Sequence, residues 1–105
     1  MRVLLAEDQP RVAAAVAKGL RRHGAAVDIA PDGVQALFRA RVHRYDVVVL
    51  DRDLPEMHGD DVCRALSTDE RITKILMLTA AAGMDDVVGG LSLGADDCVH
   101  HLRGP

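Results

Sequence analysis

The stretch VVVLDRDLPEMHG, residues 47–59, decides the fold of this chain. Its first four residues are apolar without interruption, which is typical of a parallel β-strand that is buried on both faces. Asp51 ends the run, so its carboxylate is expected at the carboxyl end of the strand. The stretch therefore predicts a central strand of an α/β domain, with helices packed on both sides of the sheet.

Similar short apolar runs occur along the chain and alternate with helical patterns. The other expected strands are residues 3–6, 26–30, 75–78 and 97–99, and the expected helices run from Pro10 to near Gly24, from Asp32, from near Asp60, and over 85–93. The order strand, helix, strand, helix predicts a doubly wound parallel sheet with right-handed crossovers. We expect Val34, Leu37 and Arg41 on the inner stripe of the second helix, and Val62 and Leu66 buried by the third.

Composition narrows the possible functions. The 105 residues fit one domain, and 49% hydrophobic with 28% charged residues is typical of a folded globular protein. The net charge is −3 and the only aromatic residues (Phe, Tyr) are Phe38 and Tyr45, so direct nucleic-acid binding by this domain is not expected. No apolar run approaches a membrane span and no secretory signal is visible, so the expected location is cytoplasmic, with Cys63 and Cys98 as reduced thiols.

Polar residues follow the expected strands directly. Glu7 and Asp8 follow the first, Asp51 closes the third, and Thr79 follows the fourth. Ligands of such sheets bind beyond the carboxyl ends of the strands. If the first and third strands are neighbours, three carboxylates converge and require a positive partner, and Mg²⁺ suits oxygen ligands and phosphate. Asp51 is then the candidate nucleophile for a phosphoryl group, and the Thr79 hydroxyl could donate a hydrogen bond to that group.

Four segments, in order, resemble the receiver domain of bacterial two-component response regulators. They are VLLAEDQ (3–9), VVVLDRDLPEMHG (47–59), ILMLTA (75–80) and GLSLGADD (90–97). The residues of these segments are most like those of receivers of the OmpR/PhoB type, which are attached to winged-helix DNA-binding domains. The resemblance implies a flavodoxin-like (CheY-like) five-stranded sheet of order 2-1-3-4-5.

The resemblance also implies roles for individual residues. It makes Asp51 the phosphoacceptor, Glu7 and Asp8 ligands of Mg²⁺ together with Asp51 and the backbone carbonyl of Asp53, and Thr79 the switch hydroxyl. The phosphoryl donor would be a sensor histidine kinase, and the output would be transcriptional regulation through a DNA-binding domain of a longer parent protein. Such a domain is not an enzyme beyond its own phosphorylation and slow autodephosphorylation.

The sequence departs from the family pattern near its end. His101 stands where the family carries a lysine, and Cys98 stands where it carries an aromatic residue. Imidazole is shorter than the lysine side chain and only partly protonated near neutral pH, so coupling through His101 should be weaker and pH-dependent. The chain ends at Pro105, before the family's last helix. Residues 1–105 are therefore expected to be a single truncated receiver domain, or a variant that covers the gap by forming a homodimer.

Two other functions fit part of the pattern. Asp51-Arg52-Asp53 after an apolar strand also resembles the DxD start of haloacid-dehalogenase (HAD)-type phosphohydrolases, with Thr79 as the next motif. Loss of the family's lysine and aromatic residue instead favours a phosphorylation-independent interaction module. By themselves, Glu7 and Asp8 before Pro10 would be a helix-capping pair.

Overall fold

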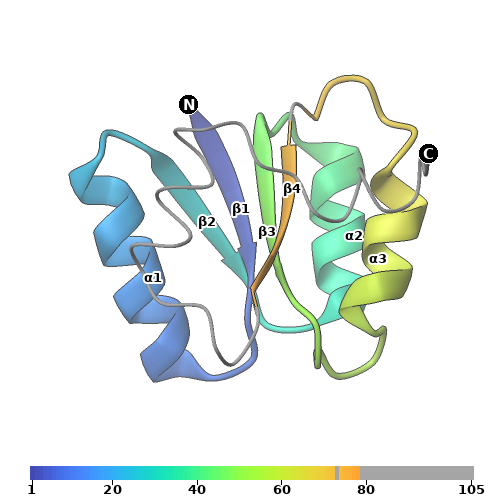
Figure 1. Cartoon of the computed structure of the whole chain (residues 1–105), viewed down its shortest axis with the longest axis horizontal. Helices are drawn as coiled ribbons and strands as arrows, with labels where there is room; N and C mark the ends of the chain where they lie inside the picture. The colour runs from blue at the N-terminus through green and yellow to red at the C-terminus, as the bar shows by residue number, and fades with distance from the viewer. Residues whose placement is uncertain (73, 79–105) are drawn as a thin grey trace.

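A computed structural model describes residues 1–72 and 74–78 of the chain. Strands and helices alternate along this part (Figure 1). The elements are β1 (Arg2–Ala6), α1 (Pro10–Arg22), β2 (Ala26–Ala30), α2 (Gly33–Val42), β3 (Val47–Asp51), α3 (Gly59–Leu66) and β4 (Lys74–Leu78). The predicted strand at 97–99 and the predicted helix at 85–93 lie outside the described residues.

The described strands form one parallel sheet of order β2-β1-β3-β4. This confirms the predicted order over these strands and makes β1 and β3 direct neighbours. Ala6 is paired with Leu50 and Asp51 with Leu78, so the carboxyl ends of β1, β3 and β4 lie at the same edge of the sheet. Helix α1 covers one face, while α2 and α3 cover the other (Figure 1).

Alternation of side chains along the strands creates two separate cores. Leu4, Val48 and Leu50 pack on the side of α2 and α3, and their sequence neighbours Val3, Leu5 and Val49 pack on the side of α1. All six side chains are fully buried. The continuous apolar run of β3 is explained by this arrangement, because both of its faces are covered.

The inner face of α2 differs from the predicted one. The buried residues of this helix are Gly33, Ala36 and Ala40, with Leu37 half-buried, whereas Val34 is 53% exposed. The prediction that Val34 and Arg41 share the inner stripe is therefore wrong. Small side chains let the helix lie close to the sheet, and Val34, Phe38 and Val42 are left exposed. In α3, Val62 and Leu66 are buried as predicted.

A polar cluster joins β1, β2 and the segment before β3. Tyr45 is 1% exposed, and its hydroxyl donates a 2.6 Å hydrogen bond to Asp28 Oδ2, which also lies 3.4 Å from the Arg2 guanidinium. The hydrogen bond from Tyr45, followed by the charge of Arg2, lowers the pKa of Asp28. Burial and the neighbouring carboxylate raise the pKa of Tyr45 to about 12. The cluster fixes the edge strand β2 to the centre of the sheet.

Cys63 does not match its prediction. Its side chain is buried in the core on the α2 and α3 side, and the structure assigns it to a disulfide instead of a free thiol. The prediction of a reduced thiol is therefore wrong for Cys63, and Cys98 lies outside the described residues. Over the part of the chain that the structure covers, no helix has the length and apolar character to cross a bilayer.

Candidate metal and phosphoacceptor site

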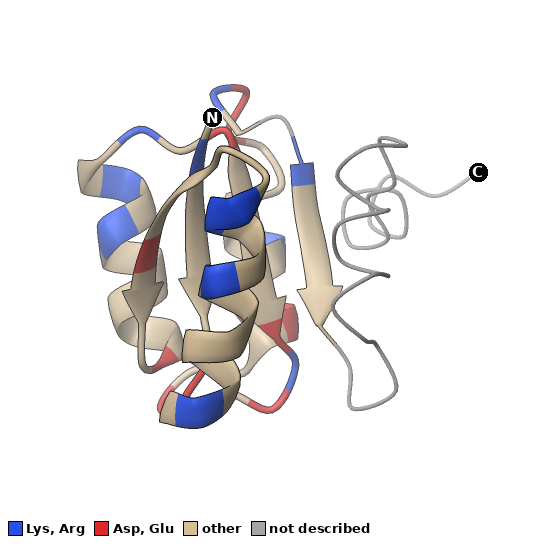
Figure 2. Ribbon diagram, turned by 90° about the vertical axis from the view of Figure 1, so that its left-hand side faces the viewer, with Lys and Arg blue, Asp and Glu red and all other residues tan. Residues whose placement is uncertain are grey.

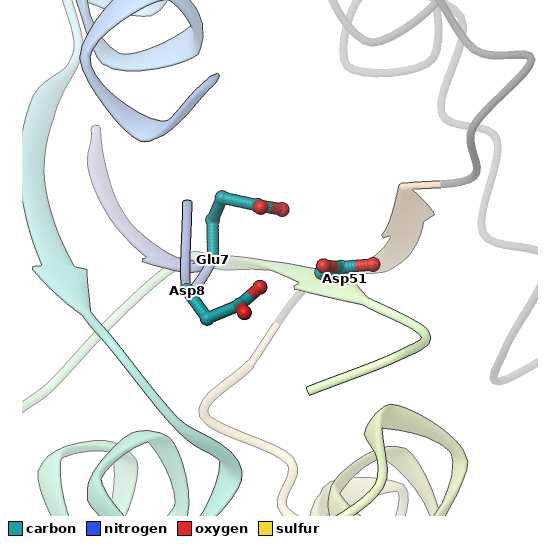
Figure 3. A group of neighbouring side chains, drawn as sticks. All are labelled: Glu7, Asp8 and Asp51. Carbon is teal, nitrogen blue, oxygen red and sulfur yellow. The ribbon is translucent and has the colours of Figure 1, made fainter. Parts of the chain in front are cut away.

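Three carboxylates meet where β1 and β3 end (Figure 3). Glu7 and Asp8 follow β1 directly, and Asp51 is the last residue of β3. Because the two strands are paired in register, the side chains of Glu7 and Asp51 extend from adjacent strand ends. One oxygen from each of the three carboxylates can be chosen so that all lie within 4.8 Å of one another. The structure thus brings together the three acidic residues that the sequence placed at this edge.

The environment of the three groups differs. Glu7 is buried, Asp51 is half-buried and Asp8 is exposed. Within residues 1–72 and 74–78, Glu7 is the one ionisable acidic or basic residue of the Asp, Glu, Lys and Arg types that is buried. A buried carboxylate without a cationic partner is costly, so such groups take up a proton or bind a cation. This burial is the main electrostatic feature of the site.

Burial raises the pKa of Glu7 to about 7. A shared hydrogen bond with Asp51 and the negative charges of Asp51 and Asp8 raise it further, while the backbone N–H of Gln9 stabilises the carboxylate from 3.2 Å. In the absence of a cation, Glu7 therefore keeps its proton to a higher pH than an ordinary glutamate. A divalent cation would replace that proton, because metal ligands bind in their deprotonated form.

The loop after β3 holds Asp51 by its backbone. The N–H of Asp53 donates to Asp51 Oδ1 at 3.2 Å, and the N–H of Gly59 donates to the carbonyl of Arg52 at 3.0 Å. A Cβ atom on Gly59 would overlap with the carbonyl oxygen of Asp51, so only glycine allows α3 to begin this close to the strand. The first turn of α3 thus fixes the position of the candidate phosphoacceptor.

Sequence reasoning did not single out His58, which precedes α3 and lies beside the site. Its Nδ1 accepts a hydrogen bond from the N–H of Asp60 at 3.2 Å, and its Nε2 lies 3.8 Å from Asp53 Oδ1. Arg52 lies 3.5 Å from Asp60. These groups lie together on the exposed surface of the loop. Little in the sequence pointed to His58, because histidine is not a preferred helix N-cap.

Of the other predicted site residues, the structure describes Asp53 but not Thr79 or His101. Asp53 is next to Asp51 through its N–H, and the use of its carbonyl as a metal ligand stays a prediction. Thr79 and His101 lie outside the described residues. Leu78, the residue before Thr79, is paired with Asp51. In the ribbon of Figure 2, several of the acidic residues lie in loops beyond the ends toward which the strands point, and basic residues lie along the helices.

The parallel sheet with helices on both faces, and the acidic site at its carboxyl edge, define a receiver domain. The family model described as the response regulator receiver domain matches residues 3–101, and the chain belongs to this family. Its fold is the CheY-like doubly wound one, and its curated relatives include transcriptional regulators of the OmpR/PhoB type.

Individual relatives agree with this assignment. The transcriptional regulatory protein CutR of Streptomyces coelicolor is 57% identical over 97 residues, which are 92% of this chain and 45% of that protein. The chain thus spans less than half the length of this relative. Response regulator TrrA of Thermotoga maritima, solved in complex with Mg²⁺ and BeF, aligns with a TM-score of 0.73 at 29% identity, covering 91% of this chain and 81% of that chain. A complex of the histidine kinase ThkA with TrrA gives a TM-score of 0.69 at 29% identity, covering 78% and 71%.

Proposed function

We propose that this domain accepts one phosphoryl group on Asp51 from a phosphohistidine of a sensor histidine kinase. The observation that carries the proposal is the convergence of Glu7, Asp8 and Asp51, with ligand atoms within 4.8 Å, at the edge of a receiver sheet. The N–P bond of the donor breaks, an O–P bond forms to the Asp51 carboxylate, and the histidine nitrogen leaves with the electron pair. The reported complex between ThkA and TrrA supports a kinase as the partner.

Mg²⁺ is the proposed cofactor, with ligands from Glu7, Asp8, Asp51 and the carbonyl of Asp53. When bound, it neutralises the oxygens of the phosphoryl group during transfer. The donor set contains only oxygen, which suits this ion, and the raised pKa of Glu7 indicates an uncompensated buried acid that a cation would relieve. The presence of Mg²⁺ with BeF in TrrA supports this choice.

The remaining steps of the switch are assigned from the sequence. We assign Thr79, the residue after β4, as the switch hydroxyl, and His101 as a weaker and pH-dependent substitute for the family's lysine. The output is transcriptional regulation in the cytoplasm through a DNA-binding domain of a longer parent protein. The length of CutR, of which this chain covers 45%, supports such a parent. We also propose a homodimer of this chain as a second mode of association.

Phosphorylation of the whole chain with acetyl phosphate and Mg²⁺ tests the proposal. Intact mass spectrometry should show one added phosphoryl group on the wild type and on Asp61→Asn, an exposed control, and none on Asp51→Asn. Beryllofluoride should change the amide NMR spectrum in the same variants. If neither reagent acts, the chain is a phosphorylation-independent module and the proposal fails.

A steady-state assay with a phosphomonoester separates the switch from a phosphohydrolase. We expect no sustained turnover, and a single phosphoryl group per chain that is lost slowly from Asp51. Turnover of many phosphomonoesters per chain would instead establish the enzyme. The autodephosphorylation rate is measured in the same experiment, after the acetyl phosphate is removed.

A further inference from the structure

The outward face of α2 carries an apolar stripe. Val34, Phe38 and Val42 are spaced four residues apart, so they lie on one face of the helix, and they are 53%, 65% and 57% exposed. Phe38 is the one phenylalanine of the chain. Only two other large apolar side chains in the described residues are classed as exposed, Met1 and Val12. A stripe of this kind on a two-turn surface is typical of a protein contact.

Basic groups border this stripe. At 100° per residue, Arg39 and Arg41 fall on opposite sides of the line through the three apolar residues. His43 and Arg44 follow the helix, and no acidic residue occurs between Asp32 and Asp46. Neither arginine of the helix, nor Arg44, forms an ion pair with a described residue. The charge of Arg39 also acts on Asp28, whereas the charges of Arg41 and Arg44 are not balanced by an ion pair within the described part of the domain.

We propose that this α2 face, formed by Val34, Phe38, Val42, Arg39 and Arg41, is a docking surface for an acidic amphipathic helix of another protein. Such a helix would place apolar side chains on the stripe and Glu or Asp side chains opposite the two arginines. Recognition of an amphipathic helix through a few apolar positions spaced three or four residues apart is a common mode of binding. Phe38, at the centre, is the expected main contact.

Charge favours an acidic helix over two other possible partners of the α2 face, which are a second copy of the chain and an anionic membrane. Two copies of α2 packed against each other would match their stripes but would bring together six arginines, counting Arg44, with no acidic residue from either helix. An anionic membrane would attract the arginines, but α3, on the same face of the sheet (Figure 1), carries Asp60 and Asp61 with their side chains about half exposed. An acidic helix avoids the first conflict, and because it is only as wide as α2 it meets the carboxylates of α3 over a smaller area than a membrane would.

The test is a selection from a displayed library of helical peptides against the whole, unphosphorylated chain. We expect enriched peptides to carry apolar residues at positions i, i+4 and i+7 or i+8, with acidic residues beside them. Phe38→Ser should weaken binding of an enriched peptide about tenfold or more, a change of roughly 1.4 kcal/mol. Val12→Ser, which removes an exposed apolar side chain from α1, is the matched control and should leave binding within about twofold.

Charge exchange gives a second readout. Arg41→Glu should weaken binding of the acidic peptide, and replacing the facing Glu of the peptide by Lys should restore it. Enrichment of peptides without acidic residues, or equal binding by Phe38→Ser, would overturn the proposal. Self-association of the chain in analytical ultracentrifugation that Phe38→Ser removes, or Phe38-dependent binding to phosphatidylglycerol vesicles, would also overturn it. Asp51→Asn should bind like the wild type, so the outcome is independent of the phosphoacceptor.

Discussion

Replacement of Glu7 by glutamine should change how the stability of the metal-free protein depends on pH. Burial raises the pKa of Glu7 from 4.5 to about 7, so the folded state holds this proton more tightly than the unfolded state. The contribution of Glu7 to stability is therefore fully present below about pH 4.5 and is lost as the pH rises to about 7. A shift of this size corresponds to about 3 kcal/mol in the free energy of unfolding.

The glutamine side chain of Glu7→Gln has no proton to lose in this range. The free energy of unfolding of the variant should therefore not decrease between about pH 4.5 and about pH 7 as that of the wild type does. Without metal, we compare the free energy of unfolding of the variant with that of the wild type at two pH values. The variant's advantage should be larger at about pH 8 than at about pH 4.5. Saturating Mg²⁺ should reverse the order, because the wild type gains stability from binding and the variant loses a ligand.

Urea denaturation across this pH range, with and without Mg²⁺, measures both effects. Glu70→Gln is the matched control, because Glu70 is exposed and lies away from the site, and its pH curve should run parallel to that of the wild type. Parallel curves for Glu7→Gln and the wild type would refute the argument, since they would mean that Glu7 titrates alike in the folded and unfolded states.

Other substitutions test the cation, the edge strand and the loop. Asp8→Ala should abolish the rise in melting temperature that Mg²⁺ gives the wild type, and an unchanged rise would place the cation elsewhere. Tyr45→Phe should cost about 2 kcal/mol in chemical denaturation and raise the pKa of Asp28 toward its ordinary value in an NMR titration; an unshifted Asp28 would contradict the hydrogen bond between them. Gly59→Ala should lower stability by roughly 2 kcal/mol and slow phosphorylation of Asp51 by acetyl phosphate, and stability equal to that of the wild type would refute the tight contact.

The strands and the acidic site follow from local sequence. The run Val47–Leu50 predicted a strand buried on both faces, and the structure places β3 between β1 and β4 with cores on either side. Glu7, Asp8 and Asp51 were predicted together because parallel strands share a carboxyl edge. Once the sheet was recognised, the meeting of these carboxylates required only that β1 and β3 be neighbours, an order that the family resemblance supplied and the strand pattern did not.

The inner face of α2 could not be predicted from size alone. Periodicity placed Val34 on the inner stripe, whereas close packing of the helix on the sheet buries the small side chains of Ala36 and Ala40. Both faces of the helix are apolar, so the hydrophobic pattern did not determine which one is buried. The pKa of Glu7 was also beyond the sequence, because its cause is burial that depends on the three-dimensional fold.

Close contacts at two glycines also limit the length of the loop from Asp51 to α3. Gly33 donates its N–H to the carbonyl of Pro55 at 3.1 Å, and a Cβ there would overlap with the carbonyl of Met57, just as one on Gly59 would overlap with that of Asp51. The loop is thus held by α2 at one point and by α3 at another. An inserted or deleted residue would have to displace both helices together, so this segment should tolerate changes of exposed side chains while keeping a constant number of residues.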